Sequence, residues 1–251
     1  MSKPPISIIT VSFQAAATIG TTLDSVRIQK TEGLEHLVQD GGSTDSTEDI
    51  VKSYPHARFI GETDSGIYDG LNKAIQNAGG DIIGLLNADD FYLNESVISQ
   101  VLAVFNENPD LLGVYGDLQY VRADDTEKVV RHWSAGTFSP NKLRRGWMPP
   151  HPTLFLRREV YENVGLFDTR YAISADYDFM IRVFKQYGDK IEYLPSVLIG
   201  MRMGGVSNAN LRSLLRKTRE DLTIARRAGF FAPLAIFGKI TGKLNQFRLP
   251  I

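Results

Sequence analysis

Short apolar runs alternate with polar turns and amphipathic segments through the first half of the chain. The apolar, β-rich runs lie at 6–11, 34–39, 57–61 and 81–86. Segments with helical spacing follow the first three runs, and the clearest, at 66–78, places Ile, Leu and Ala on one face. Strands and helices that alternate at this length predict a parallel sheet covered by helices on both faces.

The second half is less regular. The segments 111–121 and 128–134 predict two antiparallel strands joined by a turn with two acids. Residues 135–153 are rich in Pro, Gly and basic side chains, which predicts a loop. The segment 174–188 is amphipathic and predicts a helix with Ser174 at its N-cap.

Composition narrows the class of protein. The chain has 251 residues, 43% hydrophobic and 23% charged, as in ordinary globular proteins. It contains no cysteine, which excludes disulfides and thiolate metal sites. The net charge of −1 combines an acidic body with a basic end, because residues 208–251 hold nine Lys/Arg and two acids. The acidic body argues against nucleic-acid binding.

Four turns follow the predicted strands, at 12–14, 40–45, 62–66 and 87–90. The carboxyl ends of parallel strands meet at one edge of a sheet, and open α/β sheets bind ligands there. Three of these turns carry acidic residues. The sequence therefore predicts a ligand site lined by carboxylates along this edge.

The adjacent acids Asp89 and Asp90 directly follow a buried run. Two neighbouring carboxylates repel each other, and burial without a positive partner is unfavourable. Mg²⁺ and Mn²⁺ prefer oxygen ligands, often one or two carboxylates plus a diphosphate. One interpretation is a cation held against a nucleotide diphosphate. The other is a solvated turn in which Asp90 caps a following helix.

Three other segments carry candidate chemistry. The turn at 40–47 either caps the next helix or contacts a nucleotide, and it lacks the lysine of a Walker loop. Asp176, in the first turn of a predicted helix, is either a structural residue or a catalytic base, with Asp178 as a cap. Arg202 precedes a glycine pair and either neutralises a phosphate or belongs to a connector.

The order of these segments resembles the family 2 glycosyltransferases of the GT-A fold. The matching stretches are ISIITVSFQ with LDSV, DGGSTDST, DSGIYDGLNKAIQNAGGDIIGLLNADD, and GLFD followed by SADYDFMIR. The stretch DSGIYDGLNKAI is similar to bacterial enzymes, of the colanic-acid type, that build exopolysaccharide or O-antigen units. The resemblance implies an α/β GT-A fold: a Rossmann-like, mostly parallel sheet sandwiched by helices, with a C-terminal helical tail.

The resemblance also implies an inverting, metal-dependent hexosyltransferase that moves a sugar from a nucleotide-diphosphate donor to a saccharide acceptor, often lipid-linked. Asp89 is then the ligand of Mn²⁺ or Mg²⁺, with Asp90 as its rival, and Asp176 is the base. The implied nucleotide-sugar contacts are Thr10, Ser12, Asp40, Asp64, Asn87 and Asp89, and Arg202 joins them as the candidate phosphate contact noted above.

Three positions depart from the family pattern. Asn87 replaces the first acid of the metal motif, Ala175 replaces a Glu before the base, and Gly41 replaces a second acid that contacts uracil. A UDP-sugar remains the first choice of donor, with GDP- and dTDP-sugars as alternatives. Two rival functions are a sugar nucleotidyltransferase and a non-catalytic subunit of a polysaccharide-assembly complex. Against the first, SFQAAA stands where a Gly-rich loop belongs.

The segments suggest a GT-A domain at 1–205, with a nucleotide-sugar-binding half at 1–120 and an acceptor-binding half at 121–205. Residues 206–251 form a basic amphipathic tail. This tail either lies on an anionic membrane surface or packs on the domain or on a second subunit of a homodimer. The lack of cysteine and of a leader-like start fits a cytoplasmic protein at the inner face of the cell membrane.

Overall fold

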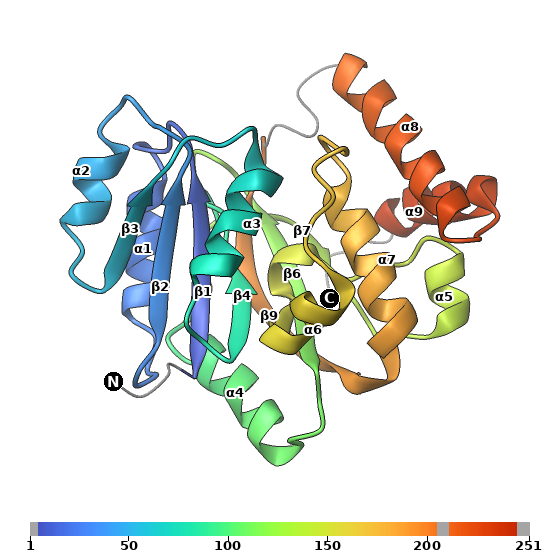
Figure 1. The fold of residues 1–251 in the computed structure, drawn as a ribbon, viewed down its shortest axis with the longest axis horizontal. Coiled ribbons are helices and arrows are strands. Elements are labelled where there is room, and N and C mark those ends of the chain that lie inside the picture. The colour runs from blue at the N-terminus through green and yellow to red at the C-terminus, as the bar shows by residue number, and fades with distance from the viewer. Residues whose placement is uncertain (1–4, 205–210, 245–251) are drawn as a thin grey trace.

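The computed structural model describes residues 5–204 and 211–244. Within this part of the chain, a mixed sheet of nine strands runs through the centre of the molecule (Figure 1). Its strand order is β3-β2-β1-β4-β8-β6-β9-β5, and β7 pairs with β6 outside this path.

The strands are β1 (Ile6–Ser12), β2 (Glu35–Asp40), β3 (Ala57–Gly61), β4 (Ile82–Leu85), β5 (Phe91–Tyr92), β6 (Gly113–Val121), β7 (Val129–Trp133), β8 (Phe155–Arg157) and β9 (Ile191–Arg202). The helices are α1 (Ile19–Arg27), α2 (Thr47–Lys52), α3 (Ile67–Asn77), α4 (Val97–Glu107), α5 (Pro140–Arg144), α6 (Arg158–Val164), α7 (Ala175–Tyr187), α8 (Leu211–Arg227) and α9 (Ala232–Leu244). Two short 3-10 turns, η1 (His151–Thr153) and η2 (Gly188–Lys190), complete the described elements.

The parallel sheet predicted for the first half is confirmed. β1 pairs in parallel with β2 and β4, and β2 pairs in parallel with β3. The register places Ser12 opposite Asp40, and Asp40 opposite Gly61. Because every residue of β1 is buried, its sequence is nearly continuous in apolar and β-branched residues rather than alternating. The strand ends therefore meet at one edge, as expected.

The second half makes the sheet mixed. β8 is antiparallel to both β4 and β6, and β6 runs parallel to β9. The predicted antiparallel pair is confirmed as β6 and β7. Finally, β5 pairs antiparallel with β9, Phe91 opposite Gly200, so the segment that follows Asp90 lies against the end of β9.

Helices cover both faces of the sheet. On one face α3, α6 and α7 contribute buried residues such as Leu71, Tyr161 and Phe179 to the larger core. On the other face α1 and α4 contribute Val26 and Val101, and α2 packs beside α1. This arrangement is the sandwich of helices around a sheet that the sequence predicts.

The prediction of a continuous loop at 135–153 is wrong, because this segment contains α5 and η1. Ser139 accepts a hydrogen bond from the Lys142 amide at 3.2 Å, and Pro140 occupies the first helical position. A Ser cap followed by Pro is a favourable helix start, and it allows a single turn within a Pro- and Gly-rich segment.

The predicted helical tail is present as α8 and α9, which lie beside α7 (Figure 1). Two glycines allow α9 to approach the turn after α5 at backbone distance. A Cβ on Gly238 would overlap the carbonyl oxygen of Arg145, and one on Gly146 would overlap that of Ala235. The predicted boundary at 205/206 falls outside the described residues.

Candidate active site

Asp40, the last residue of β2, organises the first turn of the site. Its Oδ2 accepts hydrogen bonds from the hydroxyls of Ser12 and Ser43, each at 2.7 Å. Its Oδ1 accepts the amides of Gly42 and Ser43 at 3.0 and 2.7 Å. The side chain is buried, so this carboxylate holds the ends of β1 and β2 together.

Asp64, in the turn after β3, reaches the same place from the next strand end. Its Oδ1 accepts the amide of Gly66 at 2.9 Å. A Cβ on Gly41 or on Gly70 would lie 2.7 Å from Asp64 Oδ2. The missing side chain at residue 41 therefore leaves room for a carboxylate that arrives from another turn.

Asp89 and Asp90 follow β4 and differ in exposure. Asp89 is partly exposed, whereas Asp90 is fully buried. Asn87 Nδ2 donates to Asp90 Oδ2 at 2.7 Å, and Thr22 Oγ1 donates to the Asp90 carbonyl at 2.7 Å. The interpretation of Asp90 as a helix cap is wrong, since β5 follows directly and α4 begins only at Val97.

Both carboxyls of this pair have a raised pKa. Burial raises the pKa of Asp90 well above its usual value, and the charge of Asp89 adds to the rise. Burial also raises the pKa of Asp89, although Arg202 acts in the opposite direction. Asp90 Oδ1 is buried without a hydrogen-bond partner. Carboxylate oxygens of this kind fit a divalent cation, which would add to the positive charge of Arg202.

Among residues 5–204 and 211–244, no three His, Cys, Asp or Glu side chains lie close enough together to hold a metal ion by themselves. The carboxylates after β4 could therefore provide only part of a coordination shell. A ligand bearing phosphate oxygens would have to complete it.

Arg202, at the end of β9, lies next to Asp89. Its Nη1 donates to the Asp89 carbonyl at 2.7 Å, and its Nη2 donates to Thr21 Oγ1 at 3.1 Å. The guanidinium carbon lies 5.5 Å from the centre of the Phe91 ring. The pairing of β5 with β9 thus brings the predicted anion-binding arginine to the predicted metal-binding turn.

Thr10 stands apart from this group. It lies inside β1, fully buried, with its hydroxyl 3.0 Å from His36 Nε2. Its side chain therefore has no exposed surface to offer a ligand. Ser12, two residues later, is the residue of β1 that joins the strand-end carboxylates.

Asp176 lies in the first turn of α7, as predicted. Its Oδ1 accepts the Tyr177 amide at 2.8 Å and lies 3.2 Å from Tyr68 Oη. Burial raises the pKa of Tyr68, and the charge of Asp176 raises it further, so the phenol stays protonated and able to donate. Ser174 occupies the N-cap position as predicted, but its hydroxyl makes no capping bond.

Tyr68 is a residue that the sequence did not single out. It lies in the first turn of α3, two residues before Gly70, against which Asp64 packs. One turn of α3 therefore contacts Asp64 on the side of the first strands and Asp176 on the side of α7. Its position inside DSGIYDGLN was the available signal.

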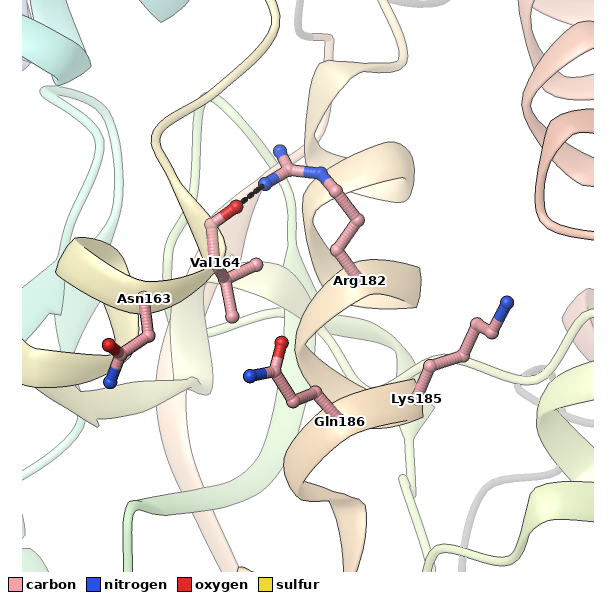
Figure 2. Close-up of a pocket in the computed structure, with 5 residues that line it drawn as sticks. All are labelled: Asn163, Val164, Arg182, Lys185 and Gln186. Carbon is pink, nitrogen blue, oxygen red and sulfur yellow. Dashed lines mark hydrogen bonds between the residues drawn. The ribbon is translucent and has the colours of Figure 1, made fainter.

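A separate open hollow of about 310 Å³ lies between the end of α6 and the second half of α7 (Figure 2). It is lined by Asn163, Val164, Arg182, Lys185 and Gln186. The Arg182 guanidinium already donates to the Val164 carbonyl at 2.7 Å. None of these residues belongs to the predicted site.

Solved structures with a similar fold are GT-A glycosyltransferases. Staphylococcus aureus TarS residues 1–349, in complex with UDP-GlcNAc, has a TM-score of 0.65 and 17% identity over 87% of this chain and 66% of its own. The mannosyltransferase PcManGT of Pyrobaculum calidifontis, with GDP-Man and Mn²⁺, has a TM-score of 0.64 and 15% identity over 97% of this chain and 75% of its own. The predicted GT-A fold is confirmed.

Sequence relatives agree. A PGL/p-HBAD biosynthesis glycosyltransferase of Mycobacterium tuberculosis is 32% identical over 216 residues, which cover 83% of this chain and 81% of the relative. The chondroitin synthase of Pasteurella multocida is 25% identical over 229 residues, 90% of this chain but 23% of that protein. The family profile described as Glycosyl transferase family 2 matches residues 7–169. With this profile, these relatives and the GT-A fold in agreement, the chain belongs to glycosyl transferase family 2 and is a glycosyltransferase.

Proposed function

We propose that this enzyme transfers a sugar, with inversion, from a nucleotide-diphosphate donor to a hydroxyl of a saccharide acceptor. The observation that carries the proposal is the convergence of Asp40, Asp64, Asp89 and Arg202 on the carboxyl edge of the parallel strands. This edge is where open α/β sheets bind nucleotides. A UDP-sugar is the first choice of donor, since TarS was solved with UDP-GlcNAc; PcManGT, solved with GDP-Man, keeps a GDP-sugar as the alternative.

We assign the nucleoside to the side of Ser12, Asp40 and Asp64, and the diphosphate to the side of Asn87, Asp89 and Arg202. Asp89 is the partly exposed member of its pair and would hold Mn²⁺ or Mg²⁺. When bound, the cation would offset the negative charge that gathers on the departing diphosphate. Arg202 is fixed beside this turn by its bond to the Asp89 carbonyl and adds a second positive charge there.

Asp176 is the proposed base. It removes the proton of the acceptor hydroxyl while that oxygen attacks the anomeric carbon. The bond between the anomeric carbon and the diphosphate oxygen breaks, and the diphosphate leaves with the electron pair. Two features support this role. Asp176 stands in the first turn of α7, next to the segment held by Tyr68, and the Tyr177 amide donates to Oδ1 and orients it.

The saccharide acceptor is proposed to be lipid-linked. The helices α8 and α9 would then dock on the anionic membrane surface that carries it. Exposed apolar side chains gather on these helices and on the turn between them: Leu214, Leu215, Phe231, Leu234, Phe237 and Ile240. Both acids of α8, Glu220 and Asp221, are nearly buried in ion pairs, at 11% and 7% exposure. The outer surface of α8 is therefore basic and apolar, which suits anionic headgroups. No helix in 5–204 or 211–244 is long and apolar enough to span a bilayer.

A thermal-shift screen with UDP, GDP and dTDP, each with and without Mn²⁺, tests the donor assignment. We expect one nucleotide to raise the melting temperature in the presence of Mn²⁺, and the increase to disappear in Asp89→Ala. Release of that nucleotide from its sugar conjugate, with a saccharide acceptor, then tests transfer. A screen in which no nucleoside diphosphate stabilises the folded protein would contradict the proposal.

A further inference from the structure

Glu220 connects the tail helix α8 to the segment that leads into α7. Its carboxylate accepts three successive backbone amides: Ala172 at 3.1 Å on Oε1, and Ile173 and Ser174 at 3.0 Å each on Oε2. Arg216, one turn earlier in α8, donates to Oε1 at 3.1 Å. The side chain of Glu220 is 11% exposed, so these charge-assisted bonds are largely shielded from water.

The segment held by Glu220 is also held from the opposite side. Tyr68 Oη donates to the Ile173 carbonyl at 2.7 Å and lies 3.2 Å from Asp176 Oδ1. Ile173 is thus fixed through its amide by α8 and through its carbonyl by α3. Asp176 follows three residues later, at the start of α7. Any displacement of this segment would move Asp176 relative to the strand ends.

A second contact keeps α8 and α9 against the start of α7. Lys239 of α9 donates to Asp221 of α8 at 2.8 Å, and both side chains are nearly buried, at 13% and 7% exposure. The Lys239 ammonium also lies 3.7 Å from the centre of the Tyr177 ring. Tyr177 is the residue after Asp176, so both tail helices contact the first turn of α7.

We propose that Glu220 is a positioning residue for the transfer reaction, and that the tail pair α8–α9 is therefore part of the catalytic apparatus. The proposal rests on the proposed function in one respect, the role of Asp176 as the base. Residues 172–174 lie outside regular structure, so without Glu220 their amides would bond to water or to other acceptors. The segment would then adopt several conformations. Glu220 selects one conformation and so fixes the first turn of α7.

The Glu220→Ala variant tests this role. We expect kcat to fall by about tenfold to a hundredfold, because small misplacements of a reacting group reduce rates by that order. The KM for the donor should stay unchanged, since Glu220 does not contact the strand ends where the donor is assigned. Amide hydrogen exchange of residues 172–176 should accelerate in the folded variant, while the sheet amides keep their protection.

Two matched variants complete the test. Glu220→Gln keeps one oxygen that can accept the Ile173 and Ser174 amides but presents an NH₂ group to Ala172, so its kcat should lie between wild type and Glu220→Ala. Arg216→Ala removes an ion pair whose arginine is 60% exposed and leaves all three amide bonds, so it should retain wild-type kcat and exchange. If Glu220→Ala does not fold, the Gln variant carries the comparison.

The outcomes separate the two proposals. A folded Glu220 variant with wild-type kcat, or with unchanged exchange at 172–174, would overturn the positioning role. A fall in kcat matched by an equal rise in donor KM, or shared by Arg216→Ala, would also overturn it. If wild-type protein transfers no sugar from any donor, the proposed function fails, and the exchange measurement alone still decides whether Glu220 orders the segment before Asp176.

Discussion

Tyr68 and Asp176 are 108 residues apart in the sequence, yet Tyr68 Oη lies 3.2 Å from Asp176 Oδ1. The contact joins the first turn of α3 to the first turn of α7. It therefore links the half of the fold that carries the strand-end carboxylates to the helix that carries the proposed base. The same hydroxyl donates to the Ile173 carbonyl at 2.7 Å, so Tyr68 holds both the base and the segment before it.

Replacement of this phenol is the first prediction. Tyr68→Phe keeps the ring packed near Phe167 and removes the hydroxyl that serves Asp176 and the Ile173 carbonyl. Without the bond to the Ile173 carbonyl, the first turn of α7 can shift, and a small misplacement of a reacting group reduces rates by about tenfold to a hundredfold, so kcat should fall by that order. Steady-state kinetics with the donor found in the screen measure this. Tyr54→Phe, a change far from Asp176, should leave kcat at the wild-type value.

The two central carboxylates give the second prediction. Asp89→Ala and Asp176→Asn should each reduce transfer by at least about 10²–10³-fold, the usual loss when one such contact is removed. Nucleotide-dependent stabilisation with Mn²⁺ should vanish in Asp89→Ala and persist in Asp176→Asn, because only Asp89 is assigned to the cation. Asp124→Asn, at an exposed turn, is the control. A folded Asp176→Asn with near-normal turnover would exclude this residue as the base.

Gly41 provides the third prediction. A methyl group at this position would lie 2.7 Å from Asp64 Oδ2, so Gly41→Ala must displace that carboxylate. Nucleotide affinity should weaken in this variant and in Asp64→Ala to a similar extent, as measured by titration calorimetry. Gly20→Ala is the matched control, since a Cβ there meets only Tyr54 Oη at 3.8 Å. Wild-type nucleotide affinity in Gly41→Ala would contradict the assignment of Asp64 to the nucleotide site.

His36 gives a prediction about pH. Burial, reinforced by the neighbouring His56, lowers the pKa of His36 to about 3, from 6.5 in the unfolded chain. Between these values only the unfolded state binds the proton, so the free energy of unfolding should fall as pH drops below 6.5. The limiting slope for one such group is about 1.4 kcal/mol per pH unit. Urea unfolding from pH 7 to 4 should show a shallower decline for His36→Gln than for wild type.

The tail gives the fifth prediction. Leu215 and Phe237 are 65% and 64% exposed, so Leu215→Ser and Phe237→Ser should leave the fold intact. Sedimentation with vesicles that contain anionic phosphatidylserine should fall in both variants and with rising salt. Vesicle binding equal to wild type would remove the membrane proposal. If wild type binds no vesicles but is a dimer in light scattering, and the two variants are monomers, a second subunit is the partner of the tail.

The sequence was most informative where structure depends on local pattern. The four parallel strands follow from their apolar runs, and the positions of Asp40, Asp64 and Asp89 follow from the rule that ligands bind at strand ends. The short helix α5 was missed because Ser139-Pro140 stands inside a segment whose composition is typical of loops.

Contacts between distant residues could not be predicted. Glu220 meets its amide partners across 46 to 48 residues, and the match is between a side chain and a backbone, which leaves no pattern in the sequence. The same reason applies to Asp64 over Gly41. The sequence indicates that an acid is missing at residue 41, but only the packing of three turns reveals that another acid occupies the space.

Gly146 and Gly238, each packed on a backbone carbonyl of the other segment, have a consequence for protein engineering. Neither position has room for a methyl group. The tail of a related enzyme grafted after β9 would therefore pack on α5 and its turn only if it also had a glycine at the position of Gly238. Chimaeras meant to exchange acceptor preference should therefore swap the turn after α5 together with the last two helices, as one unit.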